Sequence, residues 1–269
     1  MRKIAHISDL HFGTEDPLVA RGLLKELTAR SPHLVAISGD LTQRARKREF
    51  VAARAFLNEL APPIVVVPGN HDIPLYNLLA RFLRPLAGYG KFITPDLHPS
   101  YRDDEMVVMG TNTARSNTWK DGRISLKQIE RLREQFESAA TVPLKVLVAH
   151  HPFIPHEHDG GAALVGRLPL ALQMLEECGC DLILAGHLHQ AYSGNQAAYH
   201  LQRKRSILIA QAGTGISRRR RNEPNTYNYI EYHDDQLRLE VRGWQGAKFE
   251  TVTVKQFHRR DDGWTAHTA

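Results

Sequence analysis

The sequence predicts an α/β fold in which parallel strands alternate with helices, and three observations support that prediction. Short apolar runs of strand length end abruptly at glycine or polar residues, as Ile64–Val67 does before Pro68 and Gly69. Stretches with apolar residues at helical spacing separate these runs. Beyond residue 197 apolar and polar residues alternate instead, which predicts antiparallel strands forming a second sheet.

The first third of the chain predicts two consecutive βαβ units. We expect strands at residues 3–7, 33–37 and 64–67, with helices at 19–30 and 47–60 between them. Each unit brings the next strand back parallel to the one before. The three strands should therefore end at the same edge of one sheet.

The rest of the chain predicts further strands and helices around a less regular segment. Residues 73–105 lack a clean period, and we expect a helix at 75–82 followed by loops beside the substrate. Strands are expected at 106–110, 144–149, 181–185, 205–212, 227–232 and 237–244, and helices at 125–136, with Ser125 as its cap, and 168–177. No internal repeat or low-complexity linker divides the chain, so residues 1–269 are expected to form a single domain.

Composition excludes several classes of protein. No apolar run reaches the length of a membrane span, and the N-terminus enters a strand without a signal-peptide pattern, so we expect a cytoplasmic protein. Cys178 and Cys180 are the only cysteines, which excludes a disulfide framework and a four-thiolate zinc site. The net charge of +6 favours anionic partners without establishing nucleic-acid binding.

Side chains that bind metals follow five of the predicted strands. Asp9 and His11 are two residues apart, so in an extended segment they would point the same way and grip one ion. Seven such side chains are too many for one four-coordinate zinc, whereas two metals about 3.5–4 Å apart, bridged by a carboxylate, would use them all. They are Asp9, His11, Asp40, Asn70, His150, His187 and His189.

The motifs that carry these residues resemble a known family. Asp9-x-His11, Gly39-Asp40, Gly69-Asn70-His71-Asp72, His150-x-Pro152 and Gly186-His187-x-His189 look like the five signature motifs of the calcineurin-like metallophosphoesterase superfamily, in its order. The resemblance implies a four-layer αββα sandwich of two mixed sheets flanked by helices. The opening motif and the His-His-Pro segment look most like the bacterial branch of class III cyclic-nucleotide and glycerophosphodiester phosphodiesterases. Phe153 stands where many members of that branch have a second proline.

The resemblance also implies a role for each residue. One metal would be held by Asp9, His11, Asp40 and His189, and the other by Asp40, Asn70, His150 and His187. His71 would reach the departing oxygen of the substrate as an acid without being a ligand, and Asp72 would orient it. The two ions would be divalent or trivalent manganese, iron, zinc or cobalt.

The resulting interpretation is a hydrolase of small phosphate esters, above all a phosphodiesterase that uses a metal-bridging hydroxide. A pyrophosphatase acting on a nucleoside-diphosphate lipid intermediate is the alternative, and surface hydrophobicity around residues 73–105 would favour it. A nuclease of the same fold would need a long basic groove and a partner, and nucleic acid is not expected here. A non-catalytic scaffold would be expected to have lost ligands, yet none is missing. A homo-oligomer stays open.

Two basic runs, at residues 203–205 and 218–221, are interpreted as solvated loops. The functional alternative is that one of them borders the site and attracts phosphate. No aromatic residues interleave with them, which argues against a platform for single-stranded nucleic acid. His151 is left out of the ligand set as the second residue of a pair.

Overall fold

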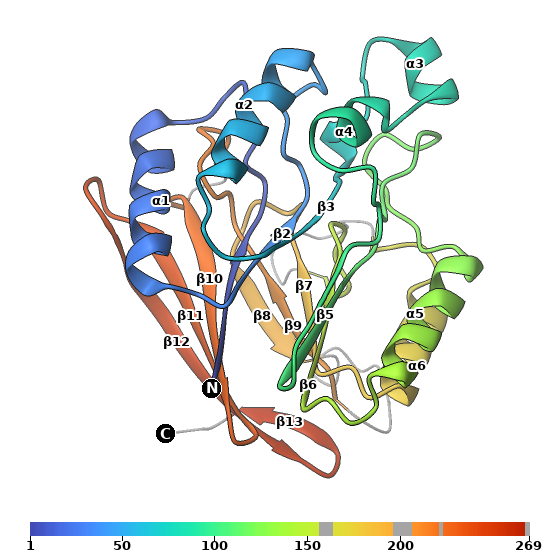
Figure 1. The fold of residues 1–269 in the computed structure, drawn as a ribbon, viewed down its shortest axis with the longest axis vertical. Helices are drawn as coiled ribbons and strands as arrows, with labels where there is room; N and C mark the ends of the chain where they lie inside the picture. Colours follow the sequence, from blue (N-terminus) through green and yellow to red (C-terminus); the bar gives the residue numbers. More distant parts are fainter. Residues whose placement is uncertain (156–163, 196–205, 221–222, 267–269) are drawn as a thin grey trace.

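Two sheets packed face to face form the centre of the molecule, and helices cover the outer face of each (Figure 1). The computed structural model describes residues 1–155, 164–195, 206–220 and 223–266. One sheet has seven strands in the order β13-β12-β11-β10-β1-β2-β3, and the other has six in the order β4-β5-β6-β7-β9-β8. Each mixes parallel and antiparallel pairs, which confirms the α/β sandwich of two mixed sheets.

The strands and the helices are each numbered in chain order. The strands of the first sheet are β1 (Arg2–Ile7), β2 (Leu34–Ser38), β3 (Ile64–Val67), β10 (Thr226–His233), β11 (Gln236–Trp244), β12 (Phe249–Arg260) and β13 (Gly263–Ala266). Those of the second sheet are β4 (Ser100–Arg102), β5 (Met106–Gly110), β6 (Leu144–Val148), β7 (Leu182–Ala185), β8 (Tyr192–Asn195) and β9 (Leu208–Gln211). The helices are α1 (Pro17–Arg30), α2 (Lys47–Asn58), the 3-10 turn η1 (Asn70–Asp72), α3 (Leu78–Leu83), α4 (Ala87–Phe92), α5 (Leu126–Ser138) and α6 (Leu168–Glu177).

Three apolar cores hold the four layers together. The pleat of β5 shows how: Met106 and Val108 pack between the two sheets, while Val107 and Met109 pack against α5 and α6. A third core lies between the first sheet and the helices α1, α2 and α4. Because the central strands are buried on both faces, they appear in the sequence as continuous apolar runs.

The tail of the chain was partly mispredicted. Strands β10 to β13 do not form a second sheet of their own; β10 pairs antiparallel with β1 and extends the first sheet. The segment around β9 lies inside the second sheet, where it pairs antiparallel with β8, the strand before it in the chain, and parallel with β7. Alternation within a strand reports burial on one face and carries no information about which free edge the strand will join.

Several elements were not predicted. Strands β4, β8, β12 and β13 and helix α4 were missed, and β12 is exposed along most of its length, so it lacks an apolar period. The helix expected at residues 75–82 begins later, where the Asn77 side chain accepts the N–H of Ala80. Ser125 is confirmed as the cap of α5, where its side chain accepts the N–H of Gln128. Across the part of the chain that the structure describes, no helix has the length and apolar content to cross a membrane.

Candidate metal centre

The loops that follow β1, β2, β3, β6 and β7 meet at the carboxyl ends of these strands, the edge at which open α/β sheets build their sites. All seven predicted ligands come together there: their His and Asp ligand atoms form groups within 4.8 Å of one another, and the Asn70 side-chain oxygen lies 3.1 Å from ring nitrogens of His150 and His187. They form two clusters that share one carboxylate.

The first cluster joins Asp9, His11 and His189. The Nε2 atoms of His11 and His189 each lie 3.6 Å from Asp9 Oδ1, and the two rings stack with centroids 5.0 Å apart. Asp9 Oδ1 and His11 Nε2 are buried and have no hydrogen-bond partner among the described residues. Buried polar atoms left unpaired are costly, and a cation held between them would satisfy both. The donor set therefore fits a metal ion.

The second cluster joins Asn70, His150 and His187. His150 Nε2 and His187 Nδ1 each lie 3.1 Å from Asn70 Oδ1, and the two ring nitrogens are 3.3 Å apart. An amide oxygen and two imidazole nitrogens converging on one point are the ligand types of a borderline divalent ion.

Asp40 lies between the clusters. Its Oδ2 is 3.7 Å from His11 Nε2 in the first, and its Oδ1 is 3.4 Å from His150 Nε2 in the second. Oδ1 also accepts the backbone N–H of His71 at 2.8 Å, which fixes the direction of the carboxylate. Asp40 thus has the position of a bridging ligand.

The backbone of the centre is strained. Five of the seven residues have left-handed φ values: 53° at Asp9, 46° at His11, 52° at Asp40, 76° at His187 and 59° at His189. Such conformations cost about 1–3 kcal/mol each and collect at functional sites. The expectation that Asp9 and His11 share an extended segment was wrong; they meet because the chain turns at both.

Two motif glycines are required by close approach. A Cβ on Gly69 would lie 2.1 Å from Asp40 Oδ1, and one on Gly186 would lie 1.9 Å from Ser8 Oγ. Ser8 Oγ in turn donates to Asp9 Oδ2 at 2.6 Å, where His187 N also donates at 3.0 Å. Both glycines therefore let neighbouring loops pack against a ligand carboxylate.

The histidines of the centre differ in pKa, and therefore in how readily each can bind a metal. Burial lowers the pKa of His187 and His189 to about 4, so at neutral pH each ring offers a lone pair. Burial also opposes a charge on His150, but the negative charges of Asp40 and Asp9, together with the hydrogen bonds to Asp40 and to the Ser38 carbonyl, outweigh it and raise the pKa of His150 to about 9. A metal in the second cluster must therefore displace the proton of His150.

His71 and Asp72 lie beside the centre but not as a pair. His71 Nδ1 is 2.9 Å from the carbonyl oxygen of Gln43, and it is this carbonyl that orients the ring. Asp72 is buried and accepts the N–H groups of Gly69, Leu41 and Thr42, so it ties the loops after β2 and β3 together. The group that contacts His71 Nδ1 is thus the Gln43 carbonyl, while the Asp72 carboxylate accepts backbone N–H groups of the two loops.

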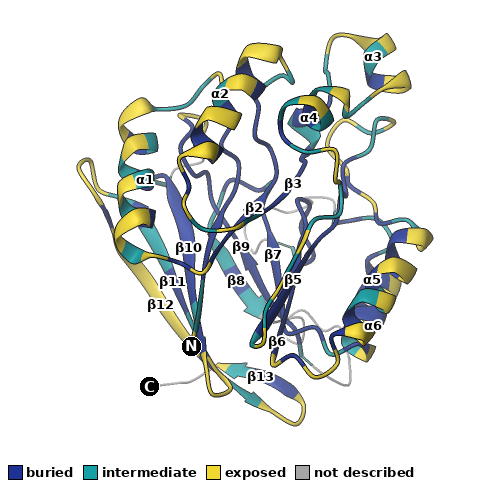
Figure 2. Cartoon of the chain, viewed as in Figure 1, coloured by how far each residue is buried: buried dark blue, intermediate teal, exposed yellow. Residues whose placement is uncertain are grey.

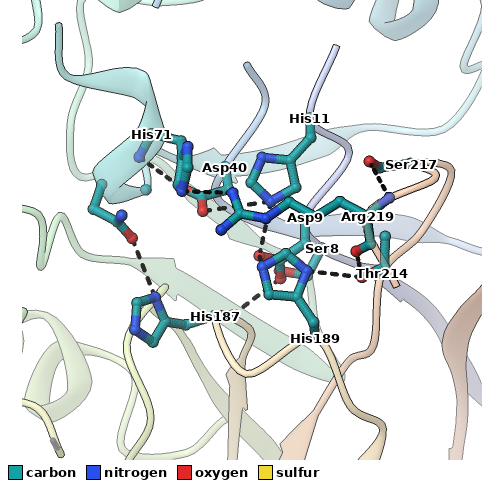
Figure 3. A network of polar contacts seen from close by, with 12 residues as sticks. Ser8, Asp9, His11, Asp40, His71, His187, His189, Thr214, Ser217 and Arg219 are labelled. Carbon is teal, nitrogen blue, oxygen red and sulfur yellow. Dashed lines mark hydrogen bonds and ion pairs between the residues drawn. The ribbon is translucent and has the colours of Figure 1, made fainter. Parts of the chain in front are cut away.

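Arg219 is a site residue, although the sequence offered a place beside the site only as the alternative interpretation of its basic run. Its side chain extends across the centre (Figure 3), and its Nη1 lies 2.9 Å from His71 Nε2. The backbone of this loop is held by Ser217 Oγ, which accepts Arg219 N, and by Thr214 Oγ1, which donates to Arg219 O. The available signal was that the run comes a few residues after a predicted strand, at 205–212, much as the ligands follow their strands. Residues 203–205 and Arg221 lie outside the described residues.

His151 belongs to the packing behind the centre. Its Nδ1 is 2.7 Å from Thr113 Oγ1 and its Nε2 is 2.9 Å from the carbonyl oxygen of Lys120. Because both nitrogens are engaged, its omission from the ligand set agrees with the geometry.

The fold and the two clusters that share Asp40 are compatible with a metal-dependent α/β hydrolase of phosphate esters. The calcineurin-like phosphoesterase family model matches residues 2–191, and the chain belongs to this family.

Two curated relatives are bacterial diesterases by name. The chain is 25% identical to a probable cyclic nucleotide phosphodiesterase of Synechococcus sp. over 70% of this chain and 74% of that protein. It is 27% identical to the glycerophosphodiester phosphodiesterase GpdQ of Enterobacter lignolyticus over 56% of this chain and 57% of that protein. The chain thus spans little more than half of GpdQ. These relatives confirm the resemblance to this bacterial branch.

Solved structures share the fold at low identity. A purple acid phosphatase from yellow lupin matches with a TM-score of 0.70 and 13% identity, over 93% of this chain and 52% of that one. A dimetal phosphatase from Danio rerio matches with a TM-score of 0.66 and 13% identity, over 94% and 98% of the two chains.

Proposed function

We propose that the protein is a dimetal phosphodiesterase that hydrolyses small phosphate diesters. The observation that carries the proposal is the position of Asp40 between two clusters whose lone pairs converge. Two metal ions held there would supply a hydroxide nucleophile and neutralise charge on the phosphoryl oxygens. We assign Asp9, His11 and His189 to one ion and Asn70, His150 and His187 to the other, with Asp40 shared. Manganese, iron, zinc and cobalt all suit this donor set.

The chain's own groups supply binding and orientation. Arg219 places a guanidinium over the centre, and His71 Nε2 engages only one of its five N–H donors. The others are available to the non-bridging oxygens of a phosphate, for which a guanidinium fork is well shaped.

We propose that His71 acts mainly by positioning Arg219. Its Nδ1 faces a carbonyl and therefore carries the hydrogen, which leaves Nε2 as an acceptor for Arg219. Protonation of the departing oxygen by His71, as the sequence suggested, requires a proton on Nε2. Asp72 supports both residues by fixing the loops after β2 and β3.

The diester class is supported by the names of the two curated relatives, whose substrates are a cyclic nucleotide and a glycerophosphodiester. A screen of the metal-reconstituted protein tests it, with bis-p-nitrophenyl phosphate, p-nitrophenyl phosphate, cyclic nucleotides and nucleotide pyrophosphates as substrates. We expect the highest kcat/KM for a diester. The exposed apolar side chains of α3 favour the pyrophosphatase alternative, and a preference for pyrophosphates of tenfold or more would replace the proposal with it.

We further propose that residues 1–269 act as a single domain, because both sheets contribute to one core between them. The cytoplasmic location and the possible homo-oligomer remain predictions from the sequence.

A further inference from the structure

Helix α3 presents its apolar side chains to solvent. Four of its six residues are large and exposed: Leu78 by 54%, Leu79 by 72%, Phe82 by 58% and Leu83 by 70%. Tyr76, exposed by 73%, precedes the helix, and Trp119, exposed by 57%, lies beside it. We call these six side chains the α3 platform. Contiguous exposed apolar side chains of this kind mark interaction sites on soluble proteins.

The helix is anchored by a buried arginine in place of an apolar face. Arg81 is only 2% exposed, and its guanidinium donates to the carbonyl oxygens of Ser116 at 2.9 Å, Pro74 at 3.1 Å and Thr118. The Trp119 ring lies 4.4 Å from Arg81 Cζ. An ordinary surface helix buries its leucines and exposes its arginines. Here the arrangement is reversed, so burying the leucines contributes nothing to folding, and the helix is held in a geometry that displays them.

The charge around the platform selects the kind of partner. Residues 73–95 contain three basic residues and no acidic one, and of the three Arg84 and Lys91 are exposed. Lys120, next to Trp119, is exposed as well, and the exposed Asp121 follows it. Figure 2 shows α3 as a projecting, largely exposed element at the periphery of the molecule. Projecting leucine, phenylalanine and tryptophan side chains flanked by cations match the composition of elements that lie in a membrane interface.

The platform adjoins the metal centre. Trp119 O accepts the Nδ2–H of Asn70 at 3.4 Å. On the other side the Tyr76 ring lies 6.0 Å from Arg44 Cζ, and Arg44 Nη1 is 3.5 Å from His71 Nδ1. A surface that covers the platform would therefore lie beside the centre.

We propose that the α3 platform docks on an anionic phospholipid bilayer. Its apolar side chains enter the boundary between headgroups and acyl chains, and Arg84, Lys91 and Lys120 contact the lipid phosphates. Docking requires no membrane-spanning helix. It also does not depend on the proposed function, since the surface binds whether or not the centre hydrolyses a diester.

Vesicle co-sedimentation of the full chain tests the docking. Probes are vesicles of phosphatidylcholine alone and of phosphatidylcholine with phosphatidylglycerol at equal amounts, at low and at physiological salt. We expect binding to the anionic vesicles and a reduction of roughly tenfold or more in the Leu79→Gln/Phe82→Gln variant. Both side chains are exposed, so the variant should fold, which its thermal unfolding checks. Arg84→Gln/Lys91→Gln should weaken binding to the anionic vesicles alone.

The matched control is Leu126→Gln/Leu170→Gln, which removes two leucines exposed by 60% and 50% on α5 and α6. It should bind like the unchanged protein. Equal binding of the platform variant and the control would overturn the proposal, as would no binding to anionic vesicles at low salt. Sedimentation velocity tests whether the platform binds a second copy of the chain instead. A dimer that Leu79→Gln/Phe82→Gln abolishes would show that it does, and would overturn the proposal.

Discussion

Replacing Arg219 by glutamine should weaken substrate binding by one to two orders of magnitude. His71 holds the guanidinium over the centre through one N–H group at 2.9 Å, which leaves further donors for phosphate oxygens. A hydrogen bond to a charged group contributes about 1.5–3 kcal/mol. At about 1.4 kcal/mol per factor of ten, KM should rise roughly 10- to 150-fold. Because the arginine contacts oxygens that are charged in the ground state as well, kcat should change much less.

Steady-state kinetics on bis-p-nitrophenyl phosphate, with inorganic phosphate as a competing inhibitor, measures both effects. Arg219→Lys keeps the charge but loses the planar fork, so its KM should fall between that of the unchanged protein and that of Arg219→Gln. Arg220→Gln is the matched control, since Arg220 is the exposed neighbour in the same run. The reasoning is refuted if Arg219→Gln and Arg220→Gln give the same KM, or if kcat collapses while KM and the inhibition constant for phosphate stay unchanged.

Three further perturbations follow from the same geometry. His71→Ala should keep both metals and raise KM as Arg219→Gln does, with similar losses for alkyl and p-nitrophenyl esters; a loss confined to alkyl esters would restore His71 as the acid that protonates the leaving group. Metal affinity of the second cluster should fall by up to tenfold for each pH unit below about 9, because the raised pKa of His150 means that a metal competes with its proton. Metal titrations between pH 6 and 9 measure this affinity, and one constant value over that range would contradict the prediction. Gly69→Ala should displace the Asp40 carboxylate, since the new Cβ would lie 2.1 Å from Oδ1, and metal content should drop together with activity. Gly90→Ala is the control and should be tolerated, because the nearest atom to its new Cβ is 3.9 Å away.

The buried parallel strands and the ligands that follow them were accessible from sequence because two local signals coincide. An apolar run that stops at Gly69 or Gly39 marks both the end of a strand and the edge at which a site forms. Each ligand could thus be placed without knowing which sheet its strand joins. That independence explains why all seven ligands converge even though the pairing of the tail strands was mispredicted.

The features that escaped prediction depend on long-range contacts. Arg219 approaches His71 only because β9 inserts next to β7, and nothing in the run of arginines distinguishes it from its exposed neighbours. The orientation of α3 depends on Arg81 reaching the carbonyls of Ser116 and Thr118, which are distant in sequence. Asp72 and His71 are adjacent in the chain, yet the η1 turn sends their side chains to different partners.

Metal content per chain tests the central claim, which is that Asp40 joins two metal sites. Protein purified without chelator and reconstituted with manganese or zinc should contain about two equivalents by elemental analysis. Asn70→Ala should retain about one, because it removes a ligand of one cluster, and Asp40→Asn should fall below that value, because both clusters depend on its carboxylate. A saturating value of one equivalent with full activity, or two equivalents retained by Asp40→Asn, would contradict the bridged centre.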